Sequence, residues 1–170
     1  MKTLSKIAVM FILFFSSNTF AQSRQIHEVY AMMMFNITKY VQWPDNSTGD
    51  FVIGVIGNDE IYTTLNSWYN GKPKGSQTYR IKSFKTAADV QNCSVVFIDK
   101  SKKGEFETVK EMSKGKGVLI MTDANGLGAK GSNINFTTVD NKLKFELNQK
   151  AFEASNLKVS GSLSAMAILI

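Results

Sequence analysis

The chain has 170 residues, of which 44% are hydrophobic and 20% are charged, and its formal net charge is +6 at neutral pH. That length suggests one domain, and the composition is that of a folded protein rather than of a disordered tail. The lysines are scattered, and no segment combines a dense basic run with interleaved aromatic residues, which argues against nucleic-acid binding.

The first 21 residues have the pattern of a secretory signal peptide. Lys2 and Lys6 form a charged start, residues 7–15 are apolar, and a short polar stretch ends in the small Ala21. A membrane anchor is the weaker interpretation, because the apolar run is too short to span a bilayer. We therefore predict export and cleavage after Ala21, which leaves a domain of about 149 residues (170 − 21) over 22–170.

Residues 26–41 are predicted to form an amphipathic helix. Its apolar stripe consists of Ile26, Val29, Tyr30, Met33, Ile37, Tyr40 and Val41. Pro44 ends the helix, because a proline disfavours the helical conformation in the residue before it. Phe35 lies almost opposite the stripe, with Met32 nearby. Either the helix is buried on two sides within its own domain, or Phe35 and Met32 meet another chain.

The middle of the chain alternates between apolar strands and helices. The expected elements are strands at 51–57, 77–84, 94–98 and 117–122, and helices at 58–69 and about 105–114. Asn58 is a good N-cap for the first of these helices. Because helices separate most of the strands, we expect a mainly parallel sheet with helices on both faces.

The stretch "NGLGAKG" (125–131) contains the spacing G-x-G-x-x-G at Gly126, Gly128 and Gly131. Two alternating segments, 132–139 and 142–147, follow it and flank Asp140-Asn141, a dipeptide suited to a tight hairpin turn. Pairing across that turn places apolar residues on one face and mostly polar residues, such as Asn135 and Glu146, on the other. Gly131 therefore leads into a strand, whereas a dinucleotide site needs its glycines to open a helix.

The C-terminal tail is predicted to hold a short helix, a strand-like segment "LKVS" and a final helix at "SLSAMAILI", which is too short to cross a membrane. Together, these elements define a single-domain α/β fold. It has a mixed, mainly parallel sheet with helices on both faces and a β-hairpin near the C-terminus.

The inventory of reactive residues argues against an enzyme. His27 is the only histidine and is expected to face solvent, and Cys93, the only cysteine, is expected to act as a small hydrophobe. Asp99 and Asp123 follow strands, at the edge where α/β sheets tend to bind ligands, although loop capping is the simpler interpretation. There is no zinc-ligand spacing, P-loop or G-x-S-x-G, so we expect no catalytic residues, metal or cofactor.

Five stretches carry a resemblance to a known family. They are "VYAMMMFNITKYVQWP" (29–44), "FVIGVIGND" (51–59), "VQNCSVVFID" (90–99), "GVLIMTDANGLGAKGSNINF" (117–136) and "KLKFELNQKAFEASNLKVSGSLSAMA" (142–167). In this order they cover nearly the whole mature chain, and the set resembles the periplasmic YfiR family. Cys93 falls where a family cysteine is often found.

The resemblance implies a non-catalytic periplasmic regulator. Family members are associated with binding and repressing an inner-membrane diguanylate cyclase, which controls cyclic-di-GMP and biofilm formation. Better-studied members carry further cysteines that form disulfides. Because this chain has only Cys93, an internal disulfide is excluded, and a redox role could only involve an intermolecular bridge.

Three sets of residues are candidates for function. Those for partner binding are Met32, Phe35 and Trp43, those for ligand binding are Asn58, Asp99 and Asp123, and Cys93 is the redox candidate. The alternative to a cyclase repressor is a small-ligand-binding sensory module coupled to a sensor kinase or another membrane protein. Homodimerisation is left open.

Overall fold

The computed structural model describes residues 18–44 and 49–170, and in the first helix it describes the side chains from Ile26 onward. Most of the predicted signal peptide lies outside the described residues, so export and cleavage after Ala21 stay predictions. Within the described part of the chain, no helix is both long enough and apolar enough to span a membrane.

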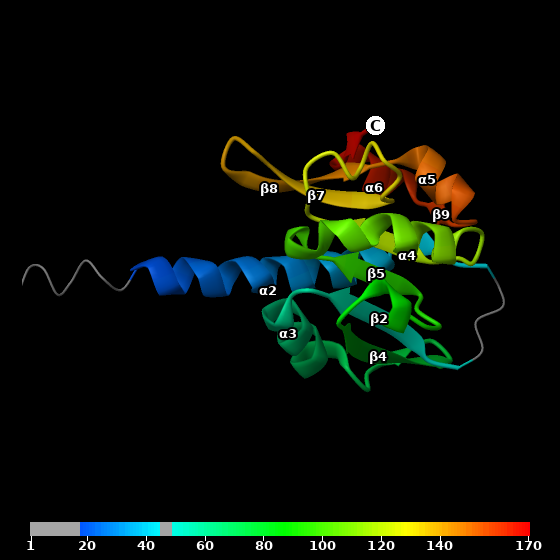
Figure 1. The fold of residues 1–170 in the computed structure, drawn as a ribbon, viewed down its shortest axis with the longest axis horizontal. Helices are drawn as coiled ribbons and strands as arrows, with labels where there is room; N and C mark the ends of the chain where they lie inside the picture. Colours follow the sequence, from blue (N-terminus) through cyan, green and yellow to red (C-terminus); the bar gives the residue numbers. More distant parts are fainter. Residues whose placement is uncertain (1–17, 45–48) are drawn as a thin grey trace, which may run out of the picture.

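An eight-stranded mixed sheet forms the centre of the described domain (Figure 1). Its strands, in spatial order, are β10 (Ile168–Leu169), β8 (Lys142–Leu147), β7 (Ile134–Val139), β6 (Leu119–Thr122), β5 (Val95–Ile98), β2 (Phe51–Ile56), β4 (Gln77–Phe84) and β3 (Pro73–Lys74). All neighbours from β4 to β7 pair in parallel, while the hairpins β7–β8 and β3–β4 are antiparallel. The predicted mixed, mainly parallel sheet is confirmed.

The parallel part of the sheet is doubly wound. Its spatial order β4-β2-β5-β6-β7 becomes 2-1-3-4-5 when these five strands are numbered along the chain, which is the order of flavodoxin-like sheets. The chain leaves β2 for β4 on one side and then crosses back to β5 on the other. The carboxyl ends of β2 and β5 therefore form the topological switch point, where such sheets usually bind ligands.

Helices cover both faces of the sheet, as predicted. They are α2 (Asn18–Thr38), α3 (Asp59–Tyr69), α4 (Phe106–Ser113), α5 (Gln149–Ala154) and α6 (Gly161–Met166), with 3-10 turns η1 (Ala87–Asp89) and η2 (Lys100–Glu105). Met34 of α2 and Leu65 of α3 pack with Ile53 in one core cluster. Phe106 of α4 packs with Val52 of the same strand in the other cluster. Both faces of β2 are thus buried, which explains its continuous apolar run.

The first helix differs from its prediction in length and in orientation. It ends at Thr38 rather than near Val41, because Val41 belongs to β1 (Val41–Gln42), which pairs with Val159 of β9 (Lys158–Val159). Its fully buried apolar residues are Ala31, Met34 and Ile37, whereas Ile26 is 46% exposed. The buried face is therefore rotated from the predicted stripe, because α2 packs against α3 as well as against the sheet.

The hairpin forms in the predicted register. Phe136 lies opposite Phe145 and Asn135 lies opposite Glu146, and the turn residues Asp140 and Asn141 adopt positive φ angles of 50° and 57°. The glycine-rich loop runs into β7 without an intervening helix, as expected. It therefore lacks the helix that a dinucleotide fingerprint requires.

The predicted final helix is only partly correct. The α6 helix ends at Met166, and β10 then pairs in parallel with the end of β8. The backbone N–H of Ile170 donates to the carbonyl of Leu147 at 3.1 Å. Pairing with the open edge of β8 satisfies backbone groups that would otherwise need water, and this favours a strand over a further helical turn.

Candidate functional site

Asn58 and Asp99 meet at the switch point between β2 and β5. The Asn58 Oδ1 atom accepts the backbone N–H of Ile61 at 2.9 Å and caps α3, as predicted. Its Nδ2 donates to Asp99 Oδ2 at 2.8 Å, and Asp99 Oδ1 accepts the backbone N–H of Ser101, also at 2.8 Å. Burial on its own would raise the pKa of the Asp99 carboxyl, but the hydrogen bonds from Asn58 and Ser101 outweigh it and lower that pKa.

The η2 turn covers the carboxyl end of β2 at the switch point. The Ser101 hydroxyl donates to the Gly57 carbonyl at 3.3 Å, and the Lys102 side chain lies directly over Gly57. Gly57 has a φ of +87° and no Cβ, and both features let η2 approach the end of β2 this closely. Asn58 and Asp99 therefore lock two loops together, which agrees with the capping interpretation.

Asp123 lies beside an open cavity of about 460 Å³ at the same edge of the sheet. Tyr30, Lys100 and Lys103 also line this cavity, so α2, η2 and the end of β6 all contribute to it. Burial, together with the charge of Asp99, raises the pKa of Asp123 to about 6. Burial and the charges of Asp123 and Asp99 raise the pKa of Tyr30 to about 12, so the phenol keeps its proton at neutral pH.

We expect Asp123→Asn to stabilise the fold at neutral and alkaline pH. The folded protein holds the Asp123 proton more tightly than the unfolded chain, so its free energy of unfolding falls as the pH rises from about 3.8 to about 6. The asparagine carbonyl can still accept the N–H of Lys100 but carries no charge. Denaturation above the folded pKa should show a more stable variant. Equal stabilities there would mean that the Asp123 carboxylate is not destabilised by burial.

His27 is not the solvent-facing residue that the sequence predicted. Only 13% of its side chain is exposed, and its Nδ1 lies 3.2 Å from Glu60 Oε2 on α3. The packing of α3 against this part of α2 explains the error. Across residues 18–44 and 49–170, no group of three or more histidine, cysteine, aspartate or glutamate residues could hold a metal ion.

The candidates for partner binding differ in exposure. Met32 is 47% exposed, whereas the Phe35 ring stacks on Tyr69 of α3 with a centroid distance of 3.7 Å and an interplanar angle of 7°. Trp43 is half-buried, and its indole N–H donates to the Ser94 carbonyl at 3.3 Å. Phe35 thus packs within its own domain, in agreement with the first of the two interpretations, and Met32 is the member of the pair that remains accessible.

Cys93 is buried just before β5, with 9% of its surface exposed, as the sequence predicted. Its thiol packs in the core cluster beneath α4, and burial raises its pKa to about 11. Cys93 and Trp43 both line a cavity of about 750 Å³ at the amino ends of the strands. A thiol with this pKa is almost fully protonated at neutral pH, which disfavours oxidation.

We expect Cys93 to react with a thiol-alkylating reagent at least tenfold more slowly in the folded protein than in the denatured protein, because both thiolate formation and access are disfavoured. Mass spectrometry of timed samples would measure the two rates. If the protein has the regulatory role that the resemblance implies, Cys93→Ser should keep that activity at some cost in stability. Loss of the response to oxidants in that variant alone, with folding intact, would instead make Cys93 a sensor.

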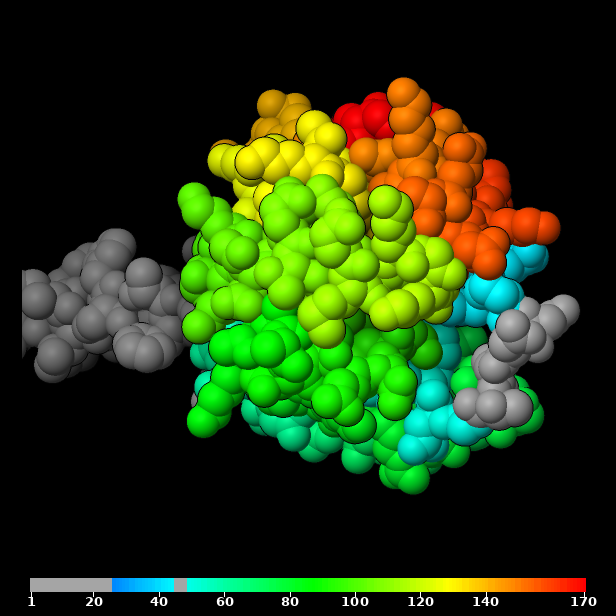
Figure 2. Space-filling view, turned by 45° about the vertical axis from the view of Figure 1, so that its right-hand side comes forward, coloured from blue at the N-terminus to red at the C-terminus, as the bar shows by residue number. Residues whose placement is uncertain are grey.

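One exposed apolar surface was not predicted from the sequence. Met166, Ile168, Leu169 and Ile170 are 58%, 36%, 52% and 46% exposed, respectively, and we call them the edge patch. Figure 2 shows the C-terminal residues on the surface beside α5. The apolar run "AMAILI" is the feature of the sequence that indicates this surface, although its composition alone favours a packed helix. Exposed apolar surface of this kind marks binding sites more often than isolated exposed residues do.

Together, the fold and the site define a class of protein: a doubly wound α/β domain whose switch point is closed by structural hydrogen bonds. The sequence profile of the YfiR/HmsC-like family matches residues 27–168, and the chain belongs to this family. A search of curated proteins found no match. The family is one of periplasmic signalling regulators rather than of catalysts, and its members act on membrane signalling proteins. The resemblance inferred from the sequence is confirmed.

Proposed function

We propose that this protein binds the periplasmic part of an inner-membrane diguanylate cyclase and represses it. Repression lowers the output of cyclic-di-GMP and so limits biofilm formation. Membership of the YfiR/HmsC-like family over residues 27–168 is the observation that carries this proposal. The closed switch point supports a regulator rather than an enzyme, because Asn58 and Asp99 are already bonded to one another and to the chain.

The edge patch is the surface best suited to the partner. Among the residues that the structure describes, β10 pairs with β8 alone, so its other edge is open to a further strand. Met166 ends α6 and Leu169 belongs to β10, and their exposed apolar side chains offer surface that a partner can remove from water. An extended, apolar segment of the cyclase would fit this combination by strand addition. Met32 is a second candidate contact, on α2.

The test compares two exposed methionines. Met166→Glu places a charge in the edge patch, whereas Met112→Glu places the same charge on α4, where Met112 is 38% exposed. Burying an unpaired charge in an interface costs several kcal/mol, so Met166→Glu should weaken binding to the cyclase's periplasmic domain at least tenfold and raise cellular cyclic-di-GMP. Met112→Glu should change neither quantity. Both proteins should remain folded by circular dichroism.

Three outcomes would contradict the proposal. If Met166→Glu and Met112→Glu behave alike, the edge patch is not the binding surface. If Met166→Glu abolishes a membrane interaction but leaves cyclic-di-GMP unchanged, the partner is not a cyclase, and a sensor kinase becomes the better candidate. If deletion of the wild-type protein does not raise cyclic-di-GMP, repression itself is excluded.

A further inference from the structure

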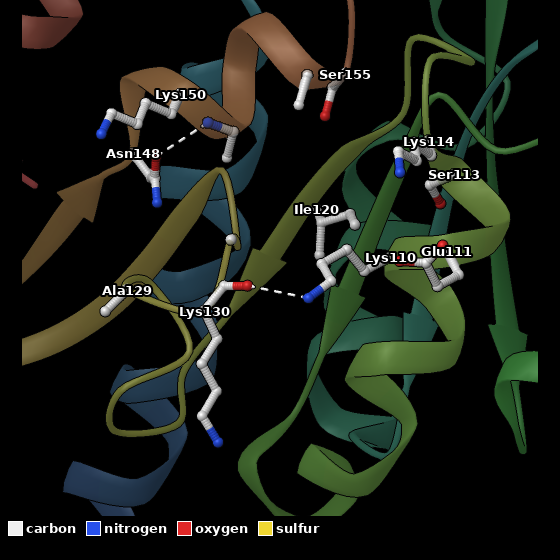
Figure 3. A pocket seen from close by; sticks show the side chains of 13 residues that line it. Lys110, Glu111, Ser113, Lys114, Ile120, Ala129, Lys130, Asn148, Lys150 and Ser155 are labelled. Carbon is white, nitrogen blue, oxygen red and sulfur yellow. Dashed lines mark hydrogen bonds between the residues drawn. The ribbon is translucent and has the colours of Figure 1, made fainter.

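A third cavity, of about 360 Å³, lies between α4, the glycine-rich loop and α5 (Figure 3). Its floor is apolar and includes Ile120 of β6 and Ala151 of α5, both of which are buried. Ala129 and Ala154 extend the apolar lining. The volume is near the lower end of the range for small-molecule sites, so the cavity suits a small metabolite and not a dinucleotide.

Four lysines surround this cavity: Lys110, Lys114, Lys130 and Lys150. They come from three separate segments: Lys110 is on α4 and Lys114 directly follows it, Lys130 is in the glycine-rich loop, and Lys150 is on α5. Glu111 is the one acidic residue in the lining. In Figure 3 the Lys130 side chain comes from the glycine-rich loop and the Lys150 side chain from α5, and both point away from α4. A lysine has enough rotamer freedom to bring its ammonium over a bound ligand.

The glycine-rich loop is held in place as one wall of the cavity. The Lys110 ammonium donates to the Lys130 carbonyl at 3.2 Å (Figure 3), and it also pairs with Glu107. Gly131 has a φ of +112°, and the Lys110 stem runs close to its Cα, where a side chain would lie in contact. Glycine is therefore favoured here by the positive φ rather than by a lack of space, because a Cβ at Gly131 would only be in ordinary contact with the Lys110 stem.

Hydroxyl groups complete the polar lining. Ser113 and Ser155 border the cavity and are 5% and 9% exposed. The Ser155 oxygen accepts a hydrogen bond from Asn133 Nδ2 at 3.1 Å, and its own proton is available to a ligand oxygen. The Asn148 amide is already engaged, because it donates to the Gly128 carbonyl and accepts from Ala151. This part of the wall is thus rigid before any ligand arrives.

We propose that this cavity binds a small multivalent anion that carries carboxylate or phosphate groups. Lys110 is paired with Glu107, so the positive charge around the hollow comes mainly from Lys114, Lys130 and Lys150, and this charge attracts anions. The apolar floor and the size of the cavity restrict the ligand to a small molecule. This site is separate from the switch-point residues and from the edge patch, and it does not depend on the proposed cyclase partner.

The experiment is calorimetry at low ionic strength with citrate as the carboxylate probe and inorganic pyrophosphate as the phosphate probe. At least one probe should bind saturably at one site per chain, and the tighter one identifies the ligand class. The double variant Lys114→Ala/Lys150→Ala should weaken binding about a hundredfold, at roughly tenfold for each lost contact. The matched control Lys142→Ala/Lys144→Ala removes the same charge from the hairpin and should stay within about twofold of wild type.

A second pair of variants tests the cavity without changing its charge. Ala154→Leu adds bulk to the lining and should weaken binding more than about tenfold, whereas Ala165→Leu, at an exposed position on α6, should not. The proposal is overturned if neither probe binds saturably. It is also overturned if the hairpin control loses as much affinity as the cavity variant, or if Ala154→Leu binds like wild type, because the anions would then be responding to overall charge.

Discussion

Asn133→Ala is expected to lower the free energy of unfolding by about 3 kcal/mol, because it leaves two buried groups without partners. Asn133 is fully buried, and its Oδ1 accepts the backbone N–H of Ile120 at 2.8 Å. Its Nδ2 donates to Ser155 Oγ, and its backbone carbonyl accepts the N–H of Asn148 at 3.1 Å. One side chain therefore joins β6 to the end of α5. Alanine keeps the backbone bond but removes both side-chain bonds.

Chemical denaturation followed by circular dichroism would measure this loss. Asn125→Ala is the matched control, because Asn125 is exposed in the glycine-rich loop and surface substitutions usually change stability by less than about 0.5 kcal/mol. A loss below about 1 kcal/mol for Asn133→Ala would mean that water replaces the asparagine and satisfies the N–H of Ile120.

Polarity along β7 was predicted correctly from the sequence, but burial was not. Alternation places Asn135 on the polar face, and the register confirms that position. Yet Asn135 is only 2% exposed, because the chain at Gly128 and the Ile170 side chain cover that face. Its amide donates to Glu146 and its carbonyl accepts the Thr122 hydroxyl at 2.7 Å. A local pattern of period two reports which residues share a face and carries no information about what covers it.

The same limit applies to the candidate sites. Residues whose role depends on the local sequence were predicted, and residues that only the fold brings together were not. Asn58 as a helix cap follows from its place before an acidic helix start, and the position of Asp99 after a strand follows from the strand pattern. The four lysines of the cavity lie between positions 110 and 150, and only the folded chain brings α4, the glycine-rich loop and α5 around one hollow. Scattered lysines resemble a solvated surface until the fold is known.

The first helix provides the other large effect, since three substitutions to glutamate on α2 should fall in a definite order. Ile37 is 3% exposed in the core beneath α2. Ile37→Glu would bury a charge with no partner and should lower the free energy of unfolding by more than about 4 kcal/mol, a large part of the roughly 5–15 kcal/mol that stabilises an ordinary domain. Met32 is 47% exposed, so Met32→Glu should cost less than about 0.5 kcal/mol.

Phe35→Glu should fall between these two, because Phe35 is half-buried and packs against α3. The substitution removes the stack on Tyr69 and the contact with Tyr79, whose ring centroid lies 5.2 Å away, so we expect a loss of about 1–3 kcal/mol. Lys39, whose Nζ lies 4.6 Å from the Phe35 ring centroid, can pair with the new carboxylate and limit the cost. Urea denaturation of the three variants measures the order. If Phe35→Glu were as stable as Met32→Glu, the aromatic stack would contribute nothing to folding, and the Phe35 ring would be free to serve a partner.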